Sequence, residues 1–173
     1  KAGGGTLVGS DSVRRAPADG YTLLFGTNAF IITPLLHNGP TYDPIKDFSH
    51  VSLTTIQPLA LLVSPSLNIK SVQELVQYAK ANPGKVSFGS SGVGSAAHLT
   101  SELLAHTAGV QMVHIPYKGT APALADLMAN NIQMLVDVPS SMMPHVNSGK
   151  VNGIGMFAKD RLPMAKDVPT LPQ

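Results

Sequence analysis

The chain has 173 residues, of which 43% are hydrophobic and only 13% are charged, and its formal net charge is +2. This composition argues against a disordered tail and against a nucleic-acid partner. Cysteine is absent, which excludes disulfides, zinc–thiolate sites and thiol nucleophiles.

The first part of the chain predicts short elements separated by turn residues. Residues 6–15 predict a short helix, which ends at Pro17-Ala18-Asp19-Gly20. Residues 21–25 predict a buried strand that leads into Gly26-Thr27-Asn28. Residues 29–36 predict a second helix.

From residue 59 onward, strands and helices alternate. Residues 59–63 predict a strand, and Ser71 with Glu74 forms a capping box at the start of a helix that ends at Asn82-Pro83-Gly84. Three further pairs of a strand and a helix follow, at residues 86–89 and 95–107, 112–115 and 120–130, and 132–138 and 140–148. This alternation predicts a parallel sheet with crossover helices.

The chain is expected to contribute to two lobes. Gly149 occupies the position of a helix C-terminal glycine, and residues 151–157 predict a strand that leads away from the preceding unit. We therefore expect residues 59–150 to form one complete α/β lobe. Residues 1–58 and 151–173 would be parts of the other lobe.

Three predicted strand-to-helix junctions are rich in donors of hydrogen bonds. They are Ser90-Ser91-Gly92-Val93-Gly94-Ser95, then Tyr117-Lys118-Gly119-Thr120, and then Asp137-Val138-Pro139-Ser140-Ser141. In open α/β sheets, ligands bind beyond the carboxyl ends of the strands, where helices begin. Each helix N-terminus stabilises a negative charge by about 0.3–1 kcal/mol. Converging junctions would therefore favour a carboxylate or a phosphate.

Each of these residues also has a purely structural interpretation. Glycine and serine are required simply to form such turns and to cap helices. His98 could reach a ligand from the first turns after the glycines, or it could cap or pack there. Asp137 could accept a hydrogen bond from a ligand amine, or it could orient neighbouring backbone donors.

An enzyme domain that binds a nucleotide or another cofactor is the alternative function. Residues 92–97 fit a loose dinucleotide fingerprint, but the end of the next predicted strand offers Ile115-Pro116-Tyr117-Lys118 where an acidic residue is expected. No pair of histidines has the spacing of a zinc site. We therefore expect no catalytic residue, no metal and no cofactor. A third possibility is a chain that binds nothing, or that associates through exposed core.

Several motifs in the same order resemble the Bug family, the periplasmic substrate-binding proteins of tripartite tricarboxylate transporters. They lie at residues 17–24, 82–85, 92–99, 113–119 and 161–170. The resemblance implies a two-lobed, type II periplasmic-binding-protein fold, with one lobe complete and the other partial. It also implies a non-enzymatic protein of the periplasm that closes around a small carboxylic acid and presents it to the membrane subunits of the transporter. Family members are longer at both ends, so the chain is expected to be truncated.

The resemblance and the junctions together define the predicted ligand-binding residues. Dicarboxylates, tricarboxylates, amino acids and aromatic acids are the ligands that the family implies. The predicted positions are Thr27, Asn28, Ser90, Ser91, Gly92, Gly94, Ser95, His98, Tyr117, Gly119, Thr120, Asp137 and Ser140. Closure is expected to bend the chain near residues 55–59 and 150–154, where it would pass between the lobes.

Overall fold

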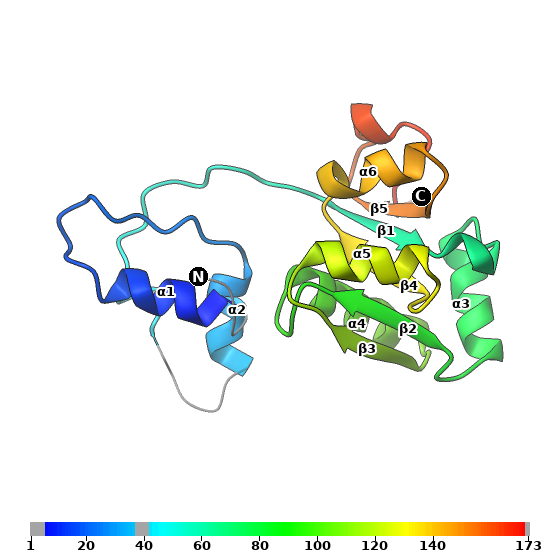
Figure 1. The fold of residues 1–173 in the computed structure, drawn as a ribbon, viewed down its shortest axis with the longest axis horizontal. Coiled ribbons are helices and arrows are strands. Elements are labelled where there is room, and N and C mark those ends of the chain that lie inside the picture. The colour runs from blue at the N-terminus through cyan, green and yellow to red at the C-terminus, as the bar shows by residue number, and fades with distance from the viewer. Residues whose placement is uncertain (1–5, 37–41, 172–173) are drawn as a thin grey trace.

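A computed structural model describes residues 6–36 and 42–171 of the chain. It contains a five-stranded sheet with helices on both faces, and an N-terminal arm that an extended segment joins to the sheet (Figure 1). None of the helices in the described ranges is long and apolar enough to cross a membrane.

The arm consists of two short helices, both where the sequence predicts them. Helix α1 spans Leu7–Arg14 and helix α2 spans Ala29–Leu36. A small apolar cluster holds them, in which Phe30 stacks on Tyr42 with ring centroids 5.3 Å apart. The Tyr42 hydroxyl also donates a hydrogen bond to the Phe30 carbonyl at 2.8 Å. The arm therefore has a small core of its own.

The predicted buried strand at residues 21–25 is wrong. This segment is extended but is not paired with another strand, and Tyr21 and Phe25 are 93% and 72% exposed. A strand is stable only beside another strand that satisfies its backbone groups. No described strand lies beside residues 21–25, so their apolar pattern does not lead to burial.

The sheet has the order β3-β2-β4-β1-β5. Its strands are β1 (Leu59–Val63), β2 (Val86–Ser90), β3 (Met112–Pro116), β4 (Met134–Asp137) and β5 (Asn152–Phe157). Strand β2 is parallel to both β3 and β4. These three strands are the part of the sheet that the alternation of strands and helices predicts correctly.

Strand β1 runs against the others, so the sheet is mixed and not parallel throughout as the alternation predicts. It pairs antiparallel with β4 on one side and with β5 on the other. The extended segment from the arm enters the sheet at the edge where β2 and β3 end (Figure 1). Because β1 starts at that edge, it has to run in the opposite direction.

Strand β5 was expected to lead away from this unit, and it does not. It pairs with β1 from Leu59 opposite Phe157 to Val63 opposite Asn152. A further bridge joins Met156 to Thr170. The chain thus forms the edge of the same sheet before residue 171, while the division of the whole chain into two lobes stays a prediction.

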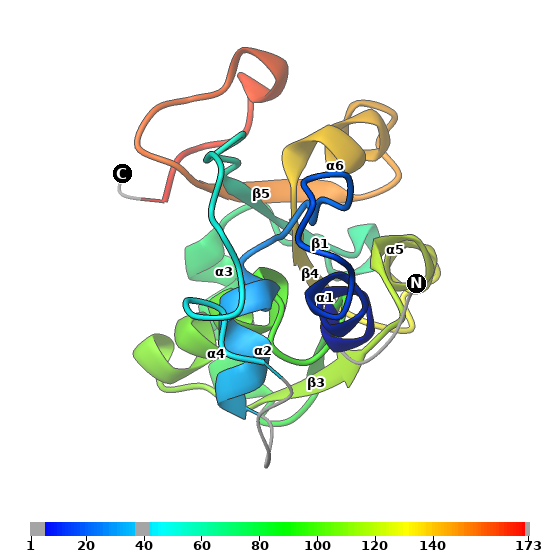
Figure 2. The ribbon, with the colours of Figure 1, turned by 90° about the vertical axis from the view of Figure 1, so that its left-hand side faces the viewer.

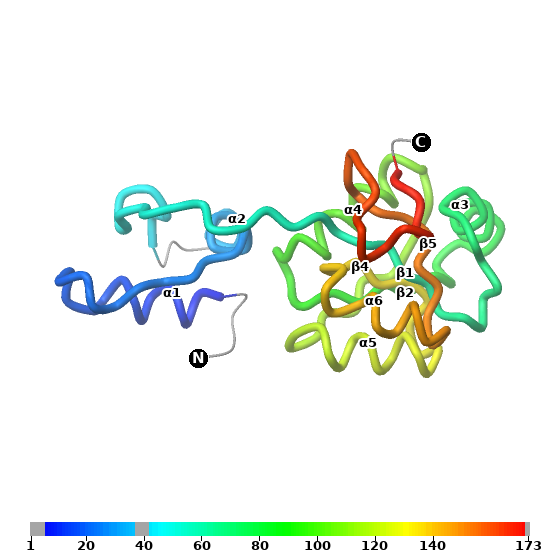
Figure 3. Tube along the Cα trace, turned by 90° about the horizontal axis from the view of Figure 1, so that it is seen from above, coloured from blue at the N-terminus to red at the C-terminus, as the bar shows by residue number. Residues whose placement is uncertain are grey.

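Helices cover both faces of the sheet (Figure 3). They bury two separate cores. One face carries α5 (Thr120–Met128) and α6 (Pro139–Asn147), and the other carries α3 (Val72–Ala81) and α4 (Ala96–Ala108). Successive strand residues point to opposite faces, so Leu62 joins the first core and Leu61 the second. Short 3-10 helices span Pro65–Leu67 and Pro163–Ala165.

Candidate functional site

The three donor-rich junctions meet at one edge of the sheet. Since β2, β3 and β4 are parallel, the residues that follow them emerge on the same side. The Tyr117 N–H donates to the Ser90 carbonyl at 3.0 Å, which ties the second junction to the first. The Thr120 hydroxyl donates to Asp137, which ties the second to the third. The structure therefore brings the predicted junctions together.

The first junction, residues 90–95 or the glycine loop, is folded around the Ser90 side chain. Ser90 is fully buried, and its Oγ accepts from the Gly92 N–H at 3.2 Å. Gly92 and Gly94 have φ angles of 140° and 81°, in the region that favours glycine. Ser95 caps α4, because its Oγ accepts from the His98 N–H at 3.2 Å. Ser90 and Ser95 thus shape the loop from inside.

Tyr117 in the second junction is hydrogen-bonded to α5, the helix that follows it. Its hydroxyl donates to Asp126 Oδ2 on α5 at 2.6 Å. Burial, together with this hydrogen bond, raises the pKa of Tyr117 to about 12, and the same bond lowers the pKa of Asp126. The phenol therefore stays protonated, and its hydrogen bond fixes the turn before α5. Gly119, with a φ of 109°, is the residue that precedes the first residue of α5.

Asp137 orients the two junctions beside it. Its carboxylate accepts hydrogen bonds from the Thr120 hydroxyl and from the Val138 N–H, the latter at 2.7 Å. Both carboxylate oxygens thus have a partner within the protein. Ser140 lies exposed in the first turn of α6, close in sequence to this carboxylate.

The arm packs against the glycine loop through α2. Figure 2, seen from the side of the arm, shows α2 in front of the sheet and α4. A Cβ atom added to Gly94 would lie 3.2 Å from both Thr33 Oγ1 and Leu36 Cδ1. Thr27 and Asn28 lie exposed at the start of α2, and their carbonyls accept its first hydrogen bonds. The observed contact with the loop runs through the later residues of α2.

His114 is not among the predicted site residues, yet it lies directly behind the glycine loop. Its Nε2 is 2.7 Å from Ser90 Oγ, and its ring stacks on His98 with centroids 4.1 Å apart. Burial and, to a smaller extent, the neighbouring His98 lower the pKa of His114 to about 4. No local pattern in the sequence marks His114. Only the pairing of β2 with β3, in which Phe88 lies opposite His114, brings it near the loop.

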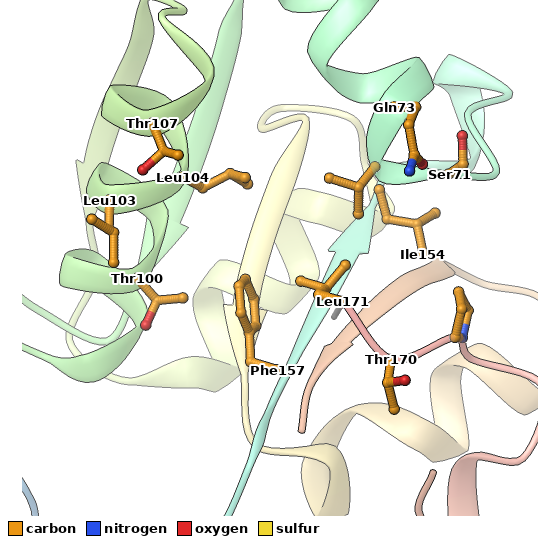
Figure 4. A pocket seen from close by; sticks show the side chains of 12 residues that line it. Ser71, Gln73, Thr100, Leu103, Leu104, Thr107, Ile154, Phe157, Thr170 and Leu171 are labelled. Carbon is orange, nitrogen blue, oxygen red and sulfur yellow. The ribbon is translucent and has the colours of Figure 1, made fainter. Parts of the chain in front are cut away.

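No group of three potential metal ligands occurs within the described ranges. A cavity of about 500 Å³ does exist, but it lies away from the junctions. Leu103 and Leu104 of α4 line one side of it, and the other side is formed by the start of α3, by β5 and by residues 169–171 (Figure 4). None of the predicted ligand-binding residues lines it. The cavity is thus separate from the junctions, and the site at the edge of the sheet stays a prediction.

A mixed sheet of this kind, covered by helices on both faces, has the fold of the periplasmic binding proteins. The solved periplasmic binding protein BugD is similar to the chain, with a TM-score of 0.91 and 33% identity. The match covers 99% of the chain and 57% of the BugD chain. The family model described as "Tripartite tricarboxylate transporter family receptor" matches residues 1–173, and the chain belongs to this family.

Sequence relatives agree with this assignment. The UPF0065 protein in the tcbD-tcbE intergenic region of a Pseudomonas strain is 35% identical over 99% of the chain and 51% of its own length. Protein BugT of Bordetella pertussis is 32% identical over 99% of the chain and 53% of its own length. The chain thus spans about half the length of the curated relatives it matches.

Two solved relatives from Rhodopseudomonas palustris contain acids. Rpa4515, solved with adipate, has a TM-score of 0.94 and 31% identity, covering 99% of the chain and 57% of its own. MatC, solved with bound malate, has a TM-score of 0.89 and 29% identity, covering 98% of the chain and 58% of its own. The prediction of the Bug family and of a periplasmic-binding-protein fold is confirmed.

Proposed function

We propose that the protein is an extracytoplasmic solute-binding receptor that captures a small carboxylate and delivers it to a tripartite transporter of the tricarboxylate type. One observation carries this proposal: three helix-starting junctions, rich in backbone N–H and hydroxyl donors, converge at one edge of the sheet. Two relatives are solved with the carboxylates adipate and malate, which supports this class of ligand. Periplasmic location and delivery to membrane subunits are supported by the family to which the chain belongs.

The charge distribution favours the glycine loop as the place where the carboxylate binds. Asp137 already sets a negative charge beside Thr120 at the start of α5. At the start of α4, the N–H of Ala96 has no hydrogen-bond partner among the described residues. A helix N-terminus of this kind stabilises an anion. We infer that α4 holds the acid and that α5 and α6 shape the rest of the site.

Neutral donors suit a site that opens and closes. They avoid burying an unpaired lysine or arginine, so closure costs less desolvation than it would with a charged residue. The segment from the arm enters β1 at Leu59, which pairs with Phe157 at the end of β5. Leu59 fits the first predicted crossing point. Asn152 and Gly153 pair with Val63 and Leu62 at the far end of β1, so we propose the second crossing after Phe157 rather than near residues 150–154.

Thermal denaturation of the intact protein tests the proposal. We expect adipate, malate or a related acid to raise the melting temperature, because a ligand that binds only the folded state stabilises it. Stabilisation by dinucleotides alone would instead establish the cofactor-binding alternative.

Replacing Ser91 by alanine should weaken binding of the acid by at least about tenfold, because a hydrogen bond to a charged group contributes roughly 1.5–3 kcal/mol. Ser91 is exposed in the loop, so its loss should leave the stability of the unliganded protein unchanged. Ser148→Ala is the matched control, since Ser148 lies exposed beyond the end of α6. Equal dissociation constants for both variants, measured by titration calorimetry, would remove Ser91 from the site.

A further inference from the structure

Two amides of the glycine loop are directed into the protein. The Gly92 N–H donates to Ser90 Oγ at 3.2 Å, and the Gly94 N–H donates to His98 Nδ1 at 3.3 Å. Ser90 Oγ is in turn 2.7 Å from His114 Nε2. The Gly94 amide is therefore hydrogen-bonded directly to a histidine ring, and the Gly92 amide is connected to one through Ser90 Oγ.

The two histidines form part of a stack of three rings. His98 lies 4.1 Å from His114 with 28° between the ring planes, and His114 lies 5.0 Å from Phe88 with 21° between them. Phe88 belongs to β2, His114 to β3 and His98 to α4. The His98 side chain is only 16% exposed. The stack thus connects the glycine loop to three elements of the rigid fold.

This arrangement determines which loop amides remain available. The Ser95 N–H is also used, because it donates to the Gly92 carbonyl at 3.2 Å. The amides of Ser91, Val93 and Ala96 have no hydrogen-bond partner among the described residues. Ser91 and Val93 are exposed. An incoming carboxylate would therefore meet these amides rather than those of the glycines.

We propose that the stacked pair of His98 and His114 positions the acid-binding loop by holding the two glycine amides inward, which leaves the amides of Ser91, Val93 and Ala96 to bind the carboxylate. Both histidines are positioning residues, because they act through the loop and not by contact with the acid. This inference rests on the proposed function.

The hydrogen bond from the Gly94 N–H selects one tautomer of the His98 ring. A backbone N–H can only donate, so Nδ1 of His98 accepts and carries no proton. The ring proton is therefore on Nε2, which lies 3.7 Å from Glu102 Oε1. Long-range nitrogen–proton NMR distinguishes the two tautomers, so this part of the inference is testable without any acid.

Two pairs of reciprocal substitutions test the positioning role. The side-chain oxygen of asparagine lies near the place of Nδ1 in histidine, whereas the amide of glutamine reaches to the place of Nε2. His98→Asn should therefore keep the acceptor for Gly94, and His98→Gln should lose it. At His114, where Nε2 makes the contact, the order is reversed: His114→Gln should keep the bond to Ser90 and His114→Asn should lose it.

We expect the two variants that lose the bond to weaken adipate or malate binding by about fivefold or more, which corresponds to about one hydrogen bond. The two variants that keep it should stay within about twofold of the wild type. His106→Asn is the control, since His106 is exposed near the end of α4. Melting temperatures of all five variants separate a loss of binding from a loss of fold. A purely structural role would not give opposite orders of affinity at His98 and His114.

Each outcome has a distinct meaning. If the wild type binds an acid but the orders at His98 and His114 are the same, the positioning role is overturned and the proposed function stands. If the wild type binds none of the acids, both fall together. Should a variant fail to fold, the wild type alone decides: slow hydrogen exchange of the Gly92 and Gly94 amides with an unprotonated Nδ1 supports the inference, and rapid exchange or a protonated Nδ1 overturns it.

Discussion

His114 is a histidine whose surroundings oppose a positive charge. The rings of Phe88 and His98 both stack on its ring, while Ser90 Oγ lies beside its Nε2. Glu102 is the nearby acidic group, and it lies beside His98 rather than beside His114. Burial therefore dominates, and the pKa of His114 falls from 6.5 to about 4.

A lowered pKa in the folded state makes stability depend on pH. The unfolded chain takes up the proton near pH 6.5, whereas folded His114 resists it until about pH 4. The unfolded state thus binds more protons in this window, so the free energy of unfolding should fall as the pH is lowered from 6.5 to 4. His114→Phe removes this contribution, and urea denaturation across this range should show a shallower decline for the variant. His106→Phe should keep the steeper wild-type decline, and equal slopes for wild type and His114→Phe would contradict the assignment.

At the scale of single elements, local sequence signals work best where a side chain closes a hydrogen bond within its own helix. Ser71 caps α3, because its Oγ accepts from the Glu74 N–H at 3.2 Å, and Glu74 reaches back to the Lys70 N–H at 2.8 Å. Both partners lie within four residues, so the sequence alone identifies the start of this helix.

Ser71→Ala should lower the free energy of unfolding by about 1 kcal/mol, the usual loss for an N-cap residue. Urea denaturation measures this directly. Gln77→Ala, at an exposed position inside α3, is the matched control and should change the stability by less than about 0.5 kcal/mol. A change at Ser71 no larger than that at Gln77 would show that α3 does not depend on its cap.

Predictions that need a distant partner are less successful. The helices and the order of β2, β3 and β4 follow from local patterns and from crossover geometry. The direction of β1 does not, because it depends on the side from which the extended segment enters the sheet. Likewise, the glycine loop and its serines are evident from composition, whereas His114 comes next to Ser90 only through pairing of strands 24 residues apart.

For the whole molecule, the extended segment at residues 49–58 separates two bodies with separate cores. Val51, Leu53 and Ile56 within it are 86%, 78% and 85% exposed, whereas Leu61 just beyond is fully buried. Few contacts oppose local opening in such a segment.

Hydrogen exchange should therefore divide sharply near residue 59. We expect amides of residues 51–56 to exchange within seconds, and those of residues 60–63, bonded to β4 and β5, to be protected for far longer. Mass spectrometry of overlapping peptides can resolve this boundary. Equal protection on both sides would mean that the segment packs against further structure in the intact protein.

The place of β1 in the sheet also bears on how the chain folds during synthesis. Its two neighbours are residues 134–137 and 152–157, which emerge from the ribosome much later. The backbone groups of β1 therefore have no strand partner until these residues have been synthesised. Strands β2, β3 and β4, with the crossovers between them, can assemble first as a parallel unit whose contacts are closer in sequence. The strand synthesised first is then inserted last, between two partners already made.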